Sequence, residues 1–471
     1  MRPSLHRLVL PVAALAALPY AASAQSMSID AQSGTWALTN ARIETVTRGA
    51  IDRGTVVIRN GIIEAVGANV TPPADARVVD LTGRTLYPGF IDLTSSLGLP
   101  QPQQQGRGGR GGIDPQILAF LGQPAQEEED EPRIVGLEPN RNVATELRLT
   151  QADVRGARDQ GITNVLVAPT RGLFRGLSAL VPMRDDTATR WIVKSPVALH
   201  VGYQTVPGQY PGSLLGVIAY QRQAFYDAQR HAQIMERYRS NPRGMARVSY
   251  DADLDALVPV VKGELPAFIA ATAENEMLRA LALADEFKIN VHLVGAVEGF
   301  RIVDKLKGAR PPIVTVDFPN PMQVTGWQYK YSTQRAMDDS ATRSAAAQKL
   351  IEGNAAALHS AGIRFALASG GLAPNTFLEN VRKAIAAGLP RNVAVEALTI
   401  RPAEIAGVAQ QLGSIETGKL ANLLVFEGEA LGTGQLRSVF VDGQQYDVVP
   451  APPGGRGGRG GRGGNTPPPN R

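Results

Sequence analysis

The feature that most restricts the fold is an alternation of short apolar runs with helical periods through the middle of the chain. Five runs rich in β-branched or apolar residues read as strands, at 164–168, 267–270, 290–294, 313–316 and 364–368. Between two of them, Met277, Leu281, Ala284 and Phe287 keep the three-to-four spacing of one buried helix face. Alternation over about 300 residues predicts parallel strands with crossover helices, in a barrel or an open doubly wound sheet.

Both ends of the chain read as β structure instead. Asn60-Gly61 lies between two apolar runs, and this dipeptide supplies the positive φ angles of a two-residue hairpin turn. Asp442-Gly443 gives the same signal near the other end. We therefore expect residues 30–85 and 412–449 to meet in space as one small β domain.

Two stretches are too poor in apolar residues to build a core. The tail 450–471 contains GGRGGRGGRGG, and the segment 101–133 combines QPQQQGRGGRGG with an acidic run. We expect the tail to be disordered and the segment to be a mobile loop. RGG tracts occur in nucleic-acid-binding tails, but a flexible solubilising role is the preferred interpretation here, without a nucleic-acid partner. One hypothesis, an envelope-associated interaction protein, nevertheless assigns the function to these tracts.

The N-terminal segment 1–24 has the order of a secretory signal peptide. Arg2 and Arg7 precede an apolar run, and Ala22-Ser23-Ala24 forms a small-residue cleavage site. The run is shorter than the roughly 20 residues of a spanning helix, and no later segment is apolar enough to span. We expect a periplasmic or secreted protein that starts at Gln25, and one without disulfides, since the chain contains no cysteine.

Three ordered motifs resemble segments of the amidohydrolase superfamily, in its imidazolonepropionase-like branch. They are TLYPGFIDLTSSLG at 85–98, GIRFALASGG at 362–371 and LGSIETGKLANLLVF at 412–426. The resemblance implies an α/β fold with a (β/α)8 TIM-type barrel over 86–411 and a small β-sandwich domain built from both chain ends. It also implies an activity, the hydrolysis of non-peptide or dipeptide C–N bonds.

The resemblance implies a metal site as well, and this chain departs from it. Members of the superfamily use zinc or another divalent metal to activate water, held by histidines and an aspartate at the ends of barrel strands. The first-strand histidine pair corresponds to Thr94 and Ser96, and the fifth- and sixth-strand histidines to Ala270 and Gly295. The eighth-strand aspartate corresponds to Gly370. We therefore expect these five positions to surround the barrel mouth, with no catalytic residue, metal or other cofactor.

The histidines after position 25 are the possible substitute ligands. His231 lies in a helical run, where we expect a solvated position, and His359 at a helix end near the surface. For His292, strand parity predicts a side chain that faces the helices. His200 can lie at a strand end near the mouth, where it is a candidate ligand-binding residue.

Two further residues suggest weaker chemistry. Lys194 resembles the carboxylated lysine of binuclear relatives, although it has no partner ligands nearby in the sequence. Asp317 follows a predicted strand and is a candidate mouth carboxylate, but acid–base work would need a second group at a matched distance.

Two functional hypotheses follow from the departure. The first is an exported amidohydrolase-family protein that has lost metal-dependent hydrolysis. It would act as the silent subunit of an active relative, in a hetero-oligomer or a homo-oligomer, or as a protein that binds a small molecule in the old pocket. The alternative is an active hydrolase of C–N bonds with a rearranged or borrowed site.

Overall fold

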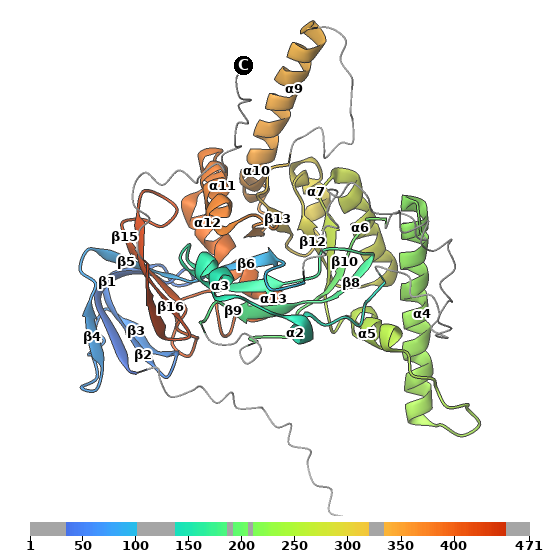
Figure 1. The fold of residues 1–471 in the computed structure, drawn as a ribbon, viewed down its shortest axis with the longest axis horizontal. Helices are drawn as coiled ribbons and strands as arrows, with labels where there is room; N and C mark the ends of the chain where they lie inside the picture. The colour runs from blue at the N-terminus through green and yellow to red at the C-terminus, as the bar shows by residue number, and fades with distance from the viewer. Residues whose placement is uncertain (1–33, 101–136, 186–191, 206–210, 320–333, 449–471) are drawn as a thin grey trace, which may run out of the picture.

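A computed structural model describes residues 34–100, 137–185, 192–205, 211–319 and 334–448. The expected signal peptide, the loop 101–133 and the tail 450–471 lie outside these ranges. A sheet of eight strands stands at one end of the molecule, beside a larger α/β part (Figure 1). Among the described helices, none is both long and apolar enough to cross a membrane.

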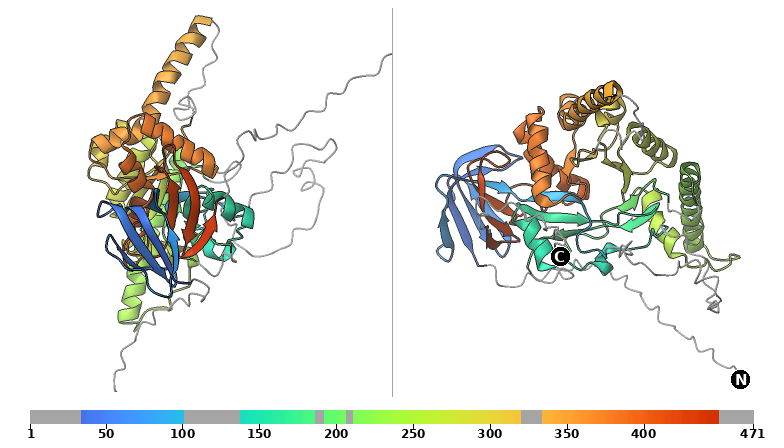
Figure 2. Two further views of the ribbon diagram at one scale, coloured as in Figure 1. Left: turned by 90° about the vertical axis from the view of Figure 1, so that its left-hand side faces the viewer. Right: turned by 45° about the horizontal axis from the view of Figure 1, so that its top comes forward.

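The eight-stranded sheet contains strands from both ends of the chain (Figure 2). Its strands are β1 (Trp36–Glu44), β2 (Ala50–Arg59), β3 (Ile62–Gly67), β4 (Arg77–Asp80), β5 (Arg84–Pro88), β15 (Leu423–Glu427), β16 (Gln435–Val441) and β17 (Gln444–Asp447). The order is β17-β16-β15-β5-β1-β2-β3, and β4 pairs with β1. Antiparallel pairing of β15 with β5 joins the two ends. The strands thus form one connected sheet, which encloses an apolar cluster of its own.

The two expected hairpin turns are present in this sheet. Asn60 and Gly61 have φ angles of 51° and 79° between β2 and β3, and Asp442 and Gly443 have 47° and 78° between β16 and β17. The chain leaves the sheet at Gly89, where a Cβ atom would lie 2.1 Å from the Thr163 hydroxyl oxygen. Only glycine therefore allows the close approach with which the larger part begins.

Within the described ranges, nine strands form the sheets of the larger part. They are β6 (Phe90–Ser95), β7 (Ile162–Val167), β8 (Phe174–Leu177), β9 (Ala179–Pro182), β10 (Leu199–Val201), β11 (Ala267–Ala271), β12 (Val291–Gly295), β13 (Ile313–Thr315) and β14 (Ala366–Ala368). One sheet has the order β14-β13-β12-β11-β10-β8, and the other has β6-β7-β9. A hydrogen bond from the Ser369 N–H to Asp92 links the end of β14 to β6.

These sheets are mixed, whereas the sequence predicts parallel strands throughout. β6 and β7 are parallel, as are β10 to β14, but β9 pairs antiparallel with β7 and β8 antiparallel with β10. Residues 168–178, between β7 and β9, contain β8 and no helix, whereas a parallel crossover needs about a dozen residues or more and usually an α-helix. The described strands are therefore barrel-like, and they do not show the expected closed eight-fold barrel.

Helices surround these sheets. They are α2 (Val143–Glu146), α3 (Gln151–Arg158), α4 (Leu214–Ser240), α5 (Ala252–Val261), α6 (Glu274–Phe287), α7 (Val303–Leu306), α9 (Gln334–Glu352), α10 (Asn354–Ser360), α11 (Pro374–Ala386), α12 (Arg391–Leu398) and α13 (Ile400–Ala406), with a 3-10 turn at Gly299–Arg301. The predicted helical period around Met277 is α6. The long helices α4 and α9 lie at the periphery (Figure 1).

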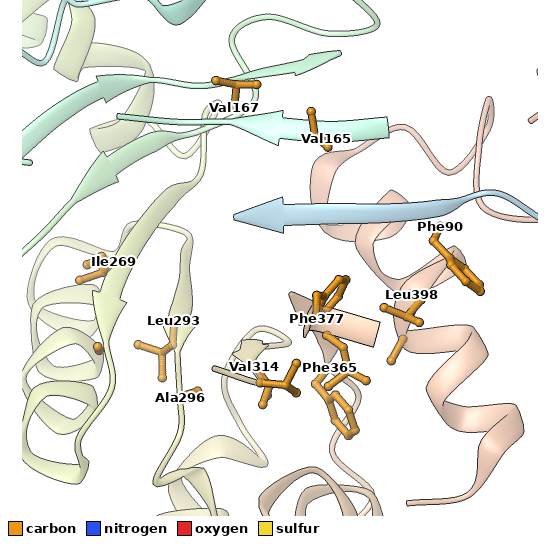
Figure 3. Packing of buried hydrophobic residues seen from close by; sticks show 14 of the residues in the cluster. Phe90, Val165, Val167, Ile269, Leu293, Ala296, Val314, Phe365, Phe377 and Leu398 are labelled. Carbon is orange, nitrogen blue, oxygen red and sulfur yellow. The ribbon is translucent and has the colours of Figure 1, made fainter. Parts of the chain in front are cut away.

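The strands of the larger part bury two different faces. On the outer face, Ile269 and Leu293 belong to a cluster shared with α6 and α11 (Figure 3). On the inner face, Phe268 belongs to a separate cluster of strand residues and α13. His292 is in register with Phe268, and their rings meet edge to face with centroids 5.4 Å apart. The prediction that His292 faces the helices was wrong, because Val291 and Leu293 take the outer positions against α6.

Candidate functional site

A cavity of about 780 Å³ lies at the carboxyl ends of β10 and β11. Tyr203, which follows β10, and Thr272, which follows β11, line it together with residues of α6. Ala270, the expected fifth-strand ligand position, is part of the lining. In barrel-like α/β proteins this end of the strands carries the active site. The cavity is therefore the candidate functional site.

Thr94 takes part in a hydrogen-bond network between β6 and the end of β14. Its hydroxyl oxygen accepts a hydrogen bond of 2.7 Å from the Gly370 N–H, and its carbonyl accepts one of 3.2 Å from the Ser369 hydroxyl. Asp92 accepts hydrogen bonds from the N–H groups of Ser369 and Thr94, at 2.9 and 3.2 Å. Burial raises the pKa of Asp92. These groups form hydrogen bonds with one another and so hold the two strands together.

The fifth and sixth strands offer no side-chain donor at the expected places. Ala270 presents a methyl group to the cavity. Gly295 has a φ of 108°, and a Cβ atom there would lie 3.0 Å from the Thr272 hydroxyl oxygen, so a histidine at this position would be strained. Val294, which pairs with Ala270 across the two strands, is also apolar. Ser96, just after β6, adds one neutral hydroxyl.

A carboxylate does lie beside the expected eighth-strand position, but it comes from the seventh strand. Gly370 has a φ of 66°, and a Cβ atom there would lie 3.1 Å from Asp317 Cγ and 3.2 Å from Thr315 Cβ. Oδ1 of Asp317 is buried and has no hydrogen-bond partner among the described residues. Gly370 thus leaves the space into which Asp317 fits.

His200 lies on β10, on the inner face of the sheet. Its ring contacts Phe268 edge to face, with centroids 5.3 Å apart, and its Nε2 atom is buried without a hydrogen-bond partner. Burial, with a smaller effect of Arg175, lowers the pKa of His200 to about 3. The imidazole is therefore neutral at physiological pH. It stands next to Arg175 in the sheet, since His200 is in register with Gly176.

The remaining substitutes do not join the site. His231 is buried between α4 and α5, and its Nε2 lies 2.9 Å from Asp255 Oδ1, so the expected solvated position was wrong. His359 is exposed at the end of α10, as expected. Lys194 donates a hydrogen bond of 2.8 Å to the Ala406 carbonyl and thereby caps the C-terminal end of α13.

The residues at the strand ends do not fit the divalent metal of the family resemblance. A catalytic zinc takes about three protein ligands, which are imidazoles or carboxylates as a rule. Within the described ranges, no group of three or more histidine, aspartate or glutamate side chains could hold a metal ion. At the expected ligand positions the described side-chain donors are the neutral hydroxyls of Thr94 and Ser96, and the carboxylate of Asp317 lies beside Gly370.

The cavity has a cationic lining that could not be predicted from the sequence. Arg171, Arg175 and Arg279 line it, with Glu276 as the acidic residue among the cavity residues. Within the described ranges, none of the three arginines forms an ion pair within 4 Å. Oε2 of Glu276 accepts hydrogen bonds from the N–H groups of residues 272 and 273, at 2.8 and 3.2 Å. Arg171 comes from the connection between β7 and β8, Arg175 from β8 and Arg279 from α6, so no spacing motif marks them.

Comparison with known proteins agrees with this geometry. The family model described as "Amidohydrolase family" matches residues 214–450. An amidohydrolase from Thermotoga maritima MSB8 is similar in structure, with a TM-score of 0.67 and 23% identity over 87% of this chain and 98% of that one. A Xaa-Pro dipeptidase solved with bound methionine has a TM-score of 0.51 and 16% identity over 88% of this chain and 100% of that one. No curated protein matches the sequence significantly.

These two structures share the barrel-like α/β fold with its additional sheet, and at such identities they are evidence for the fold alone. The matching family model covers 237 residues, from 214 to 450, of a chain of 471. It includes the long helix α4, the strands β11 to β14 and the return of the chain into the eight-stranded sheet. The chain belongs to the amidohydrolase family.

Proposed function

We propose that this amidohydrolase-family protein binds a small molecule at its mouth and does not catalyse metal-dependent hydrolysis. The observation that carries the proposal is the set of groups at the strand ends. The Thr94 hydroxyl oxygen accepts a hydrogen bond from the Gly370 N–H, and Ala270 offers a methyl group. Gly295 and Gly370 have no side chain. Without a metal, a bound water keeps a pKa far above neutrality and is a weak nucleophile.

The cavity itself supports a binding role. About 780 Å³ lies within the range of small-molecule sites. Its polar lining comes from β8, from the segments that follow β7, β10 and β11, from the N-terminal end of α4 and from α6. Two expectations from the sequence belong to the same proposal: export with cleavage before Gln25, and service as a silent subunit beside an active relative. Native mass spectrometry of the protein from its source would test the subunit role.

The test of the proposal is turnover in metal-replete protein. The substrates would be Xaa-Pro dipeptides, other dipeptides, cyclic amides and imidazolones, each with and without a chelator. We expect no turnover that the chelator abolishes. A variant with Thr94→His and Ser96→His should stay inactive too, because the fifth, sixth and eighth strands still lack ligands. Chelator-sensitive turnover by the natural chain would refute the proposal.

A second candidate function, a C–N hydrolase with a rearranged site, is favoured by one observation. The carboxylate of Asp317 occupies the space beside Gly370, and its Oδ1 has no hydrogen-bond partner among the described residues. A carboxylate at this level could accept a proton from an attacking water. Should turnover be found, Asp317→Asn would abolish it under this hypothesis, whereas Asp304→Asn, on the exposed surface of α7, would not.

A further inference from the structure

The charge of the cavity lining points to the kind of molecule that it binds. Arg171, Arg175 and Arg279 carry three positive charges, and Glu276 carries one negative charge. The carboxylate of Glu276 is already bonded to two backbone N–H groups at the start of α6. The lining therefore has an excess of two positive charges without a compensating anion among the described cavity residues.

Arg175 is the best-placed of these cations. It is half-buried on β8, and its Nε donates a hydrogen bond of 3.3 Å to the Gly172 carbonyl. No described carboxylate lies within ion-pair distance of its guanidinium. Burial lowers the pKa of Arg175 to about 10, because the charged form has lost part of its hydration. An anion in the cavity would restore that lost stabilisation.

Gly202 makes the position of this guanidinium possible. A Cβ atom on Gly202 would lie 2.2 Å from one Nη atom of Arg175 and 2.7 Å from its Cζ. The guanidinium therefore rests on the bare backbone that follows β10. With Nε bonded to the Gly172 carbonyl, the two Nη atoms form no hydrogen bond with a described residue. A guanidinium held in this way suits two parallel hydrogen bonds to a carboxylate.

We propose that the mouth cavity binds a small dicarboxylate, one of whose carboxylates pairs with the Arg175 guanidinium. The second carboxylate matches the remaining charge excess, to which Arg171 and Arg279 contribute. Tyr203 and Ala270 supply less polar surface for the carbon chain between the two carboxylates. This inference rests on the proposed binding function and names its ligand class.

Isothermal titration calorimetry on the chelator-treated full chain tests the inference. Glutarate is the probe, glutaramide is its neutral counterpart, and inorganic phosphate is a dianion of different shape. We expect glutarate to bind with an affinity that falls as salt rises, and glutaramide not to bind. Binding of phosphate in preference to glutarate, or equal binding of glutarate and glutaramide, would overturn the dicarboxylate assignment.

Variants locate the ligand. Arg175→Gln should weaken glutarate binding roughly 30-fold, the equivalent of about 2 kcal/mol, and Arg175→Lys should recover only part of it, since lysine lacks the planar fork. Arg222→Gln is the matched control, because Arg222 pairs with Glu286 and is not among the cavity residues. Unchanged affinity in Arg175→Gln would overturn the proposal.

Two checks separate the possible failures. If Arg175→Gln does not fold, as judged by circular dichroism, Gly202→Ala serves instead, because it should displace the guanidinium and weaken glutarate binding. Metal-dependent turnover would refute the proposed function, whereas the glutarate titration is done on metal-free protein. Absence of glutarate binding there would refute the dicarboxylate inference alone.

Discussion

Replacement of His200 by phenylalanine should make the protein less sensitive to mild acid. His200 is buried on β10, and its folded-state pKa is about 3 against an ordinary value of 6.5. As pH falls below 6.5, the unfolded chain takes up a proton at this residue and the folded chain does not. Stability associated with His200 is therefore complete above pH 6.5 and is lost progressively as pH falls toward 3.

The magnitude follows from the two pKa values. One pKa unit corresponds to about 1.4 kcal/mol, so 1.5 units between 6.5 and pH 5 cost about 2 kcal/mol. Any folded-state pKa below about 4 gives nearly the same cost. His292, whose pKa is also lowered by burial, adds a cost of its own that is the same in the wild type and in His200→Phe. The difference between the two proteins therefore isolates His200.

Urea unfolding at pH 7.5 and pH 5, followed by circular dichroism, measures this difference. The wild type should lose about 2 kcal/mol more than His200→Phe between the two pH values. His359→Gln, at an exposed histidine, should behave as the wild type. Equal losses in the wild type and His200→Phe would contradict the reasoning, because His200 would then be protonated in the folded protein.

Three further predictions concern packing, the strand network and export. Gly89→Ala should destabilise the protein by about 1–3 kcal/mol, because the new Cβ atom would clash with Thr163. Gly156→Ala, on the exposed face of α3, should be neutral or stabilising by up to about 1 kcal/mol. Thermal unfolding of the two variants measures the difference. Asp92→Ala should lower the free energy of unfolding in urea by about 1–3 kcal/mol, since the N–H donors of residues 94 and 369 lose their acceptor. Asp92→Asn keeps a side-chain oxygen as acceptor and should lower it less. N-terminal sequencing of the native protein should begin at Gln25, and an intact Met1 would refute export.

Local signals in the sequence were enough to predict much of the fold. Asn60-Gly61 and Asp442-Gly443 determine two hairpins because their φ angles suit few other residues. The antiparallel strands β8 and β9 were missed, since their short sequences give no sign of strand direction. The prediction for the direction of the His292 side chain was wrong for a related reason. The alternation of side chains along the strand was counted from Gly295, whose positive φ marks the irregular end of β12.

The candidate site could be predicted only where a family motif runs through it. Thr94, Ala270 and Gly370 were found because the motifs around them are intact while the ligands are replaced. Arg175 was not, because its role depends on Gly202 of another segment and on the absence of a nearby carboxylate. Such a relation exists only in the folded chain.

The most direct test of the central claim is the metal content of the mature protein after purification in the presence of zinc and exhaustive dialysis. Inductively coupled plasma mass spectrometry would give the number of metal ions for each chain. The account predicts far less than one, because Thr94, Ser96, Ala270, Gly295 and Gly370 supply at most two neutral hydroxyls. Near-stoichiometric zinc would contradict it and would mean that ligands come from elsewhere.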